Sequence, residues 1–122
     1  MWDDVGILRD ARGLERAAST LRGLEDELRG IGVSGSDLRY NLTWHDWLNL
    51  SSLVTVSGAI CAAALARTDS RGAHFREDFP ETGELATSQF SRVRMDSRLN
   101  YEISFRPVAF TRVAPGQSLL AA

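Results

Sequence analysis

The sequence predicts a mainly α fold, a three-helix bundle whose C-terminal extension forms a β-hairpin. Apolar residues recur at helical spacing through residues 11–29, and an uncharged, largely apolar run fills residues 48–66. After Pro80 the pattern changes, and residues 99–106 alternate strictly between apolar and polar, as half-buried strands do. A chain of 122 residues is long enough for one domain with one core.

The N-terminal region predicts two helices of unequal length. The segment "MWDDVGIL" is typical of a short helical turn, with Asp3 and Asp4 near the positive end of the helix dipole. Asp10 is the expected N-cap of a second helix over residues 11–29. Charged residues lie off its apolar stripe, so this helix has one buried face; the stripe consists of Leu14, Ala17, Ala18, Leu21, Leu24 and Leu28.

The glycines that follow match a dinucleotide-binding motif in form only. "GIGVSG", residues 30–35, has the spacing G-x-G-x-x-G. That fingerprint follows a strand and opens a helix, whereas this one closes a helix. We interpret it as a glycine C-cap and a turn, with no phosphate bound.

The third predicted helix begins with Thr43 as N-cap and Asp46 completing a capping box, beside a hydrophobic staple of Leu42 and Trp47. It should end at Ala66 or Arg67. Polar residues dilute its hydrophobicity too much for a typical membrane span, so we interpret it as a buried helix of a soluble protein. It is apolar on all sides, which predicts that it is surrounded. The first two helices can cover only part of it, and a partner chain or a missing domain should cover the rest.

The C-terminal region predicts two strands, residues 89–95 and 99–108, joined by a turn at Asp96-Ser97. A lone hairpin is marginal in water, so its apolar face must dock onto something. That face consists of Leu99, Tyr101, Ile103 and Phe105. The tail from residue 114 should be frayed.

Composition narrows the possible functions. A net charge of −2 and a pI near 5.6 give no reason to expect binding to nucleic acid or to an anionic membrane. The only cysteine, Cys61, excludes an internal disulfide and is expected to be a small buried apolar residue. His45 and His74 lie far apart on different elements, so no metal site is predicted. With no signal peptide visible, we expect a cytoplasmic protein.

The stretch "LARTDSRGAHFREDFPE" concentrates charge just after the third helix. Ser70, His74 and Asp78 could form a hydrolase triad on paper, but nothing like a nucleophile elbow surrounds Ser70. Buried charges need partners, so we expect Arg71 and Arg76 to pair with Glu77, with Asp78 or with acidic groups across an interface. The functional alternative is that one arginine lies near a small carboxylate substrate.

This stretch resembles the "AR-x-ESRGAH-x-REDFPE" segment of the succinate dehydrogenase and fumarate reductase flavoprotein family, which includes L-aspartate oxidase. "MWDDVGILRDARGL" is similar to that family's "MW-x-x-VGIVR…GL", and "YEISFRPV" resembles its "LEYRPV". All three segments occur in the family's order, across nearly the whole chain.

The resemblance implies that the chain is the C-terminal helical domain of an FAD-dependent oxidoreductase that interconverts a dicarboxylate such as succinate and fumarate. Catalytic and FAD-binding groups would lie in the rest of the parent, so this chain is expected to hold neither and to be inactive alone. The family motif is the expected anchor against the FAD-binding and capping domains, through Ser70, Arg71, Gly72, His74, Arg76, Glu77 and Asp78. An iron–sulfur subunit or a second copy would be a further partner, without direct membrane insertion; any contact with the membrane's inner face would be peripheral, through partners.

Two domains of the chain follow from this interpretation: a spectrin-repeat-like helical bundle at residues 1–80, and a tail at 81–122 whose hairpin packs on the bundle or on the parent. Asp69 stands where the family has Glu. The acidic, Trp-containing stretch that follows the motif in respiratory succinate dehydrogenases is also absent, which disfavours a membrane-complex enzyme of that kind. The alternative is a stand-alone helical interaction or oligomerisation module without catalytic activity.

Overall fold

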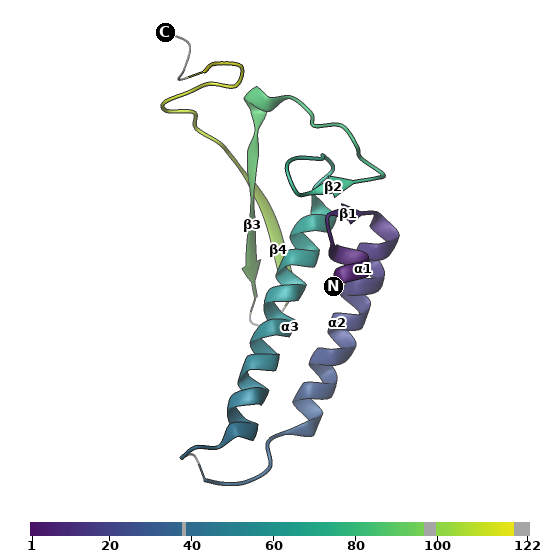
Figure 1. Cartoon of the computed structure of the whole chain (residues 1–122), viewed down its shortest axis with the longest axis vertical. Helices are drawn as coiled ribbons and strands as arrows, with labels where there is room; N and C mark the ends of the chain where they lie inside the picture. Colours follow the sequence, from purple (N-terminus) through teal and green to yellow (C-terminus); the bar gives the residue numbers. More distant parts are fainter. Residues whose placement is uncertain (38, 97–99, 119–122) are drawn as a thin grey trace.

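A computed structural model describes residues 1–37, 39–96 and 100–118. Two long helices, α2 (Ala11–Ile31) and α3 (Leu42–Ala66), lie side by side and antiparallel (Figure 1). Strands β3 (Gln89–Met95) and β4 (Tyr101–Pro107) form an antiparallel hairpin beside the C-terminal half of α3. The predicted mainly α fold with a C-terminal hairpin is therefore confirmed.

The third long helix of a spectrin-like bundle does not form in the described part of the chain. Helix α1 (Trp2–Val5) has four residues and ends at Gly6, whose backbone is extended. A segment this short cannot provide a third layer, because a single helical turn gains few hydrogen bonds for the dihedrals it fixes. The hairpin packs against α3 instead, and a 3-10 turn (Leu85–Thr87) precedes it.

Helix α2 begins and ends as its sequence indicates. The Asp10 side chain accepts a hydrogen bond from the backbone N–H of Gly13 at 2.6 Å, which confirms Asp10 as the N-cap. Gly32 caps the other end with φ 64°, in the left-handed region that glycine adopts freely. The interpretation of the glycine run as a cap and a turn is confirmed, and the helix extends two residues beyond the predicted end.

The N-terminus of α3 corrects the predicted cap. Asn41 is the N-cap, and its Oδ1 accepts from the backbone N–H of Trp44 at 3.0 Å. The prediction of Thr43 as N-cap, with Asp46 in a capping box, is therefore wrong, because Asn is the stronger cap of the two and lies two residues earlier. Trp47 donates through Nε1 to the carbonyl of Leu28 at 3.0 Å, which ties α3 to α2. The predicted end at Ala66 is confirmed.

The core between the two helices is narrow. Its buried cluster consists of Val5, Leu14, Ala17, Cys61 and Ala64. The Cys61 thiol donates to the carbonyl of Leu14 at 3.1 Å, and burial raises the thiol's pKa. Cys61 is therefore protonated and packed at neutral pH, as predicted for a small buried residue.

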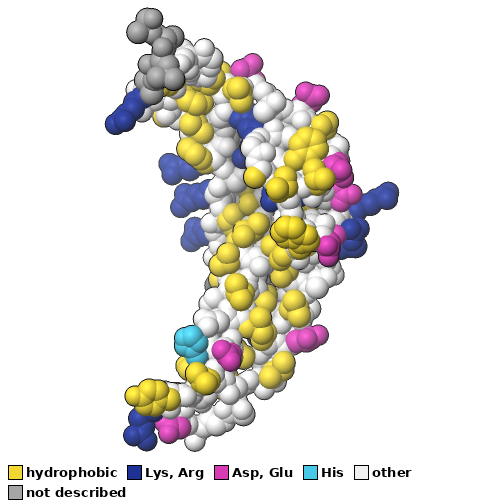
Figure 2. Space-filling model, in the orientation of Figure 1, with side chains coloured by type: hydrophobic (Ala, Val, Ile, Leu, Met, Phe, Trp, Pro, Cys, Tyr) yellow, Lys and Arg dark blue, Asp and Glu magenta, His cyan; other side chains and the backbone are white. Residues whose placement is uncertain are grey.

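Much of α3 is uncovered by this chain. Leu53 is 64% exposed, and Val56 and Ile60 are exposed as well. Figure 2 shows apolar side chains spread along the pair of helices α2 and α3. By length and composition α3 is also able to cross a membrane, a test that core helices of soluble proteins pass too. The expectation that helices of this chain cover only part of α3 is confirmed.

The hairpin rests on α3 through Tyr101. Val93 pairs with Ile103 in the middle of the ladder, and the Tyr101 hydroxyl donates to the carbonyl of Thr55 at 2.8 Å. Ser97 of the predicted turn and Leu99 of the predicted apolar face lie outside the described residues. The end of the tail, residues 119–122, lies outside them as well. The predicted pairing of the two strands is confirmed.

Glycine at position 58 makes this contact possible. A Cβ at Gly58 would lie 2.5 Å from the Tyr101 hydroxyl oxygen and 2.8 Å from its ring. We expect Gly58→Ala to displace the hairpin, although alanine in mid-helix is favoured over glycine by about 1 kcal/mol. Hydrogen–deuterium exchange over residues 89–107 measures the effect and should accelerate.

The matched control is Gly23→Ala in α2, where nothing lies within 4 Å of the added Cβ. This variant should be more stable than the wild-type protein by about 1 kcal/mol and should leave hydrogen–deuterium exchange in the hairpin unchanged. Equal hairpin exchange in the two variants would contradict the proposed contact.

Candidate functional site: an arginine clasp at one end of the helix pair

The charged stretch after α3 folds into a compact loop, residues 70–81. Backbone hydrogen bonds join Arg71 and His74 in both directions, at 2.8 and 3.0 Å, around the turn at Gly72. Gly72 has φ 56°, a conformation that other residues adopt at a cost of about 1–2 kcal/mol. The backbone N–H of Ser70 donates to the carbonyl of Glu81 at 2.9 Å and closes the loop.

Ser70 holds this loop together from inside. Its buried hydroxyl donates to the carbonyl of Phe79 at 2.7 Å and accepts from the backbone N–H of Arg76 at 2.8 Å. Both bonds are to backbone groups, so the hydroxyl is a structural crosslink. The loop is further tied to the N-terminal region, because β2 (Phe75–Arg76) pairs in parallel with β1 (Leu8–Arg9).

Arg76 is the centre of the site. Its side chain is buried, with 1% of the residue exposed, and Nη1 donates to three carbonyls at the C-terminus of α3. The acceptors are Ala64 at 3.0 Å, Leu65 at 3.1 Å and Arg67 at 2.8 Å. The last carbonyls of a helix have no partner within it and carry partial negative charge. The guanidinium therefore caps α3 by hydrogen bonding and by charge.

Asp78 completes the clasp from the other side. Its carboxylate accepts two hydrogen bonds from Arg76, with Nε–Oδ1 at 2.7 Å and Nη2–Oδ2 at 2.6 Å. Oδ2 also accepts from the backbone N–H of Ala11, the first residue of α2, at 3.1 Å. We call Arg76 and Asp78 the arginine clasp. Through two side chains in hydrogen-bond contact it connects the negative end of α3 to the positive end of α2.

The clasp predicts a defined acid sensitivity. The Arg76 guanidinium, which hydrogen-bonds the carboxylate, lowers the pKa of Asp78 to about 2. Because the folded state holds the ionised form, the clasp's contribution is complete above the ordinary pKa of about 3.9 and is lost as the pH falls towards 2. We expect the free energy of unfolding to fall in this window, and to fall less in Asp78→Asn, as measured by urea denaturation at several pH values. Identical acid dependence in both proteins would contradict the assignment.

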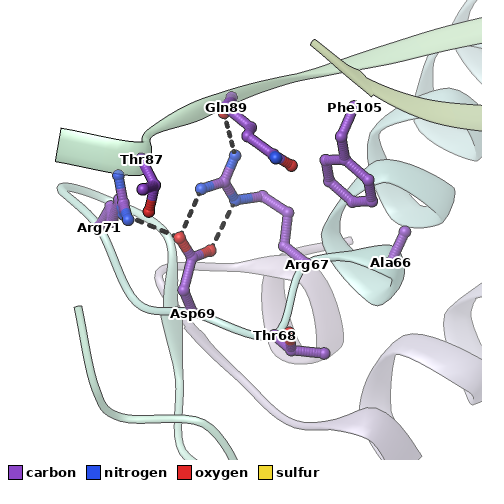
Figure 3. Close-up of a pocket in the computed structure, with 8 residues that line it drawn as sticks. All are labelled: Ala66, Arg67, Thr68, Asp69, Arg71, Thr87, Gln89 and Phe105. Atoms are coloured by element: carbon purple, nitrogen blue, oxygen red, sulfur yellow. Dashed lines mark hydrogen bonds and ion pairs between the residues drawn. The ribbon is translucent and has the colours of Figure 1, made fainter. Parts of the chain in front are cut away.

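A second cluster lies on the other side of the loop (Figure 3). Asp69 accepts from Arg67 at 2.9 and 2.8 Å and forms an ion pair with Arg71 at 2.7 Å. Arg71 also donates to the carbonyl of Thr82 at 2.8 Å and to the hydroxyl of Ser88. With Phe105 these groups line a cavity of about 220 Å³. Both arginines are paired with the same carboxylate, that of Asp69, so the cluster of two arginines and one aspartate keeps a net charge of +1.

The pairing predicted from sequence is partly confirmed. Arg76 binds Asp78 as expected, whereas Arg71 binds Asp69, which the prediction had not considered. Glu77 takes part through its backbone N–H, which donates to the carbonyl of Arg9 at 2.8 Å. Arg9 was missed because nothing in its local sequence indicates contact with the loop. Arg67 was missed as a partner of Asp69, although it lies in the charged stretch only two residues away.

The hydrolase triad, disfavoured from the sequence, does not form. The Nδ1 of His74 accepts a hydrogen bond from Arg9, and Asp78 binds Arg76 and Ala11. With the Ser70 hydroxyl bonded to backbone groups, none of the three residues bonds to another as a triad requires. Within the described ranges, no three or more His, Cys, Asp or Glu side chains are placed to hold a metal ion.

Comparison with known proteins gives the family. The sequence profile described as "Fumarate reductase flavoprotein C-term" matches residues 1–119. The chain belongs to this family. Among its relatives, the fumarate reductase flavoprotein subunit of Mycobacterium tuberculosis is 31% identical over 113 residues, 93% of this chain and 19% of the relative. The L-aspartate oxidase 1 of Ralstonia nicotianae is 39% identical over 82 residues, 67% of this chain and 14% of the relative.

Structural comparison agrees with this assignment to the fumarate reductase flavoprotein C-terminal family. A chain of Escherichia coli quinol fumarate reductase superposes with a TM-score of 0.87 over 96% of this chain, at 20% identity, which shows a shared fold. A chain of the Mycobacterium smegmatis Sdh1 complex gives 0.69 over 88%, at 28% identity. This chain spans 20% and 18% of their lengths, and about 15% of the first curated relatives.

Proposed function

We propose that the chain is the C-terminal helical domain of an FAD-dependent oxidoreductase that acts on a dicarboxylate such as succinate or fumarate, or on aspartate. The observation that carries the proposal is the family match over residues 1–119 in a chain whose match spans only 14–20% of the longer relatives compared above. One such relative, in Methanocaldococcus jannaschii, is named an FAD-dependent oxidoreductase. The role of this chain is to support the flavin and capping domains, and it is inactive alone.

The surface of the chain supports a place within a larger protein. Its accessible area is 9347 Å². A compact monomer of 13.5 kDa exposes about 6,500 Å², so roughly 2,800 Å² is in excess, as much as a large permanent interface buries. The exposed apolar residues of α3 account for part of it. Trp2, which is 91% exposed, marks a second apolar area at the N-terminus.

The glycine motif at residues 30–35 does not form a dinucleotide site. The only G-x-G-x-x-G spacing closes α2 and is followed by α3, whereas a dinucleotide site needs a strand before the glycines. We therefore place FAD in the rest of the parent, and no reaction step is assigned to this chain. The loop at residues 70–81 anchors the domain by fixing the helix ends. Ser70, Gly72 and Glu77 belong to this loop, and its side-chain contacts come from Arg71, His74, Arg76 and Asp78. The parent is cytoplasmic in this proposal, and an iron–sulfur subunit or a second copy is its further partner.

The intact protein tests this proposal. We would capture the native protein with an antibody against this chain, then record its mass and visible absorption spectrum. A polypeptide several times larger with bound flavin is the expected result. A colourless protein of 13.5 kDa would contradict it and favour the second candidate, a stand-alone oligomerisation module. The exposed face of α3 is the observation behind that candidate, since a second copy could cover it.

A further inference from the structure

His74 is held in one protonation state by its neighbours. Its Nδ1 lies 2.6 Å from Nη1 of Arg9. An arginine has only donors, so Nδ1 must be the acceptor, and the ring's single proton lies on Nε2. Nε2 is buried and has no hydrogen-bond partner among the described residues. The surroundings of both ring nitrogens therefore favour the neutral imidazole. Among the described residues, neither nitrogen has a hydrogen-bond acceptor that would stabilise the imidazolium.

The charges around the ring are mostly positive. Burial lowers the pKa of His74, and so do Arg9 of β1, Arg67 after α3, and Arg76 of β2. Asp69 opposes them, but it is already bonded to Arg67 and Arg71. A proton added at Nδ1 would remove the acceptor for Arg9 and leave two cations in contact.

We propose that His74 is an acid-sensitive latch, whose protonation separates β1 from β2 and releases the N-terminal segment from the loop. The pairing it controls is small. The ladder has two residue pairs, Leu8 with Phe75 and Arg9 with Arg76. Backbone hydrogen bonds at its ends run from Phe75 N–H to the carbonyl of Ile7 at 3.1 Å and from Glu77 N–H to that of Arg9 at 2.8 Å. Arg9 belongs both to this pairing and to the His74 contact, so repulsion at the ring acts directly on it.

The opening is local, because the clasp that joins α2 and α3 is insensitive to mild acid. The clasp keeps α2 and α3 together until Asp78 is protonated, and the pKa of Asp78 is about 2. The sign follows from linkage: the closed state favours neutral His74, so the latch is complete above the ordinary histidine pKa of about 6.5 and weakens as the pH falls below it. This inference does not depend on the proposed function.

Hydrogen–deuterium exchange of the intact protein, read by mass spectrometry at about pH 7.5 and about pH 5, tests the latch. After correction for intrinsic rates, peptides covering residues 5–9 and 75–77 should lose protection by up to about tenfold per pH unit below the ordinary pKa. Peptides covering residues 54–64 of α3 should not change. Unchanged protection at 75–77, or equal loss throughout α3, would overturn the proposal.

Variants separate the two histidines. His74→Asn keeps an acceptor near the position of Nδ1 and removes the titration, so exchange at residues 75–77 should become independent of pH in this range. His45→Asn is the control, because the exposed His45 contacts Asn49 near the N-terminus of α3. The loop follows the other end of this helix (Figure 1). It should retain the wild-type response. If His74→Asn also retained it, the proposal would be wrong, and the wild-type profile decides the question even if that variant does not fold.

Discussion

Replacing Arg76 with alanine is expected to lower the free energy of unfolding by about 3 kcal/mol. The change removes the donor for three carbonyls at the end of α3 and both hydrogen bonds to Asp78. The helix end is buried there, so water replaces these bonds poorly. Asp78 is partly exposed and regains some hydration, which keeps the loss below that of a fully buried ion pair. Urea denaturation followed by helical circular dichroism measures it.

Two further variants separate the causes. Arg76→Lys keeps the positive charge but cannot form the planar double contact with Asp78, and we expect it to lose about half as much stability. Arg29→Ala removes an exposed ion pair with Glu25, where Arg29 is 51% exposed, and should cost about 0.5 kcal/mol or less. If Arg76→Ala were no worse than Arg29→Ala, the clasp would have no role in stability.

Replacing Leu14 with alanine should have a similarly large effect, a loss of about 3 kcal/mol. Leu14 is completely buried. The other buried residues of its cluster are Val5 and the small residues Ala17, Cys61 and Ala64, and the partly buried Ala18, Leu21 and Leu65 pack against them. With few large neighbours to fill the space, the cavity stays open, which is the condition for a high cost. The free energy of unfolding of domains of this size is only about 5–15 kcal/mol, so the variant should unfold at a temperature well below that of the wild-type protein.

Leu24→Ala provides the matched control for the core. It removes the same atoms from the same helix at a position that is 42% exposed. We expect it to cost about 1 kcal/mol or less, because much of the side chain is already in water. Equal losses at positions 14 and 24 would show that the helix pair has no packed core at Leu14.

Local patterns in the sequence predicted the local structure well. The Asp10 cap, the glycine end of α2, the end of α3 and the antiparallel hairpin each depend on residues a few positions apart. The errors arose where two local signals competed. Asn41 and Thr43 both suit an N-cap, and only the position of the first helical turn decides between them. The sequence predicted a short first helix. It did not predict that this helix would be too short to form the third member of a bundle.

The candidate site could be predicted only in part, for a physical reason. The charged composition of the loop indicates that Arg76 needs an acidic partner, and Asp78 lies two residues away. The other partners depend on how the helices pack. Asp78 reaches Ala11, which is 67 residues distant in sequence, and His74 reaches Arg9 across 65. No periodicity or cap rule connects such positions, so their contacts appear only in the folded chain.

The long separation between Ala11 and Asp78 also has a kinetic consequence. Bonds within the loop, such as those of Ser70 with Arg76, Phe79 and Glu81, span at most 11 residues and can form early in folding. The bond to Ala11 closes 67 residues of chain and waits until both helices are aligned. Contacts completed after the rate-limiting step slow unfolding without speeding folding. We therefore expect the bond between Ala11 and Asp78 to slow unfolding of the native state without speeding its formation.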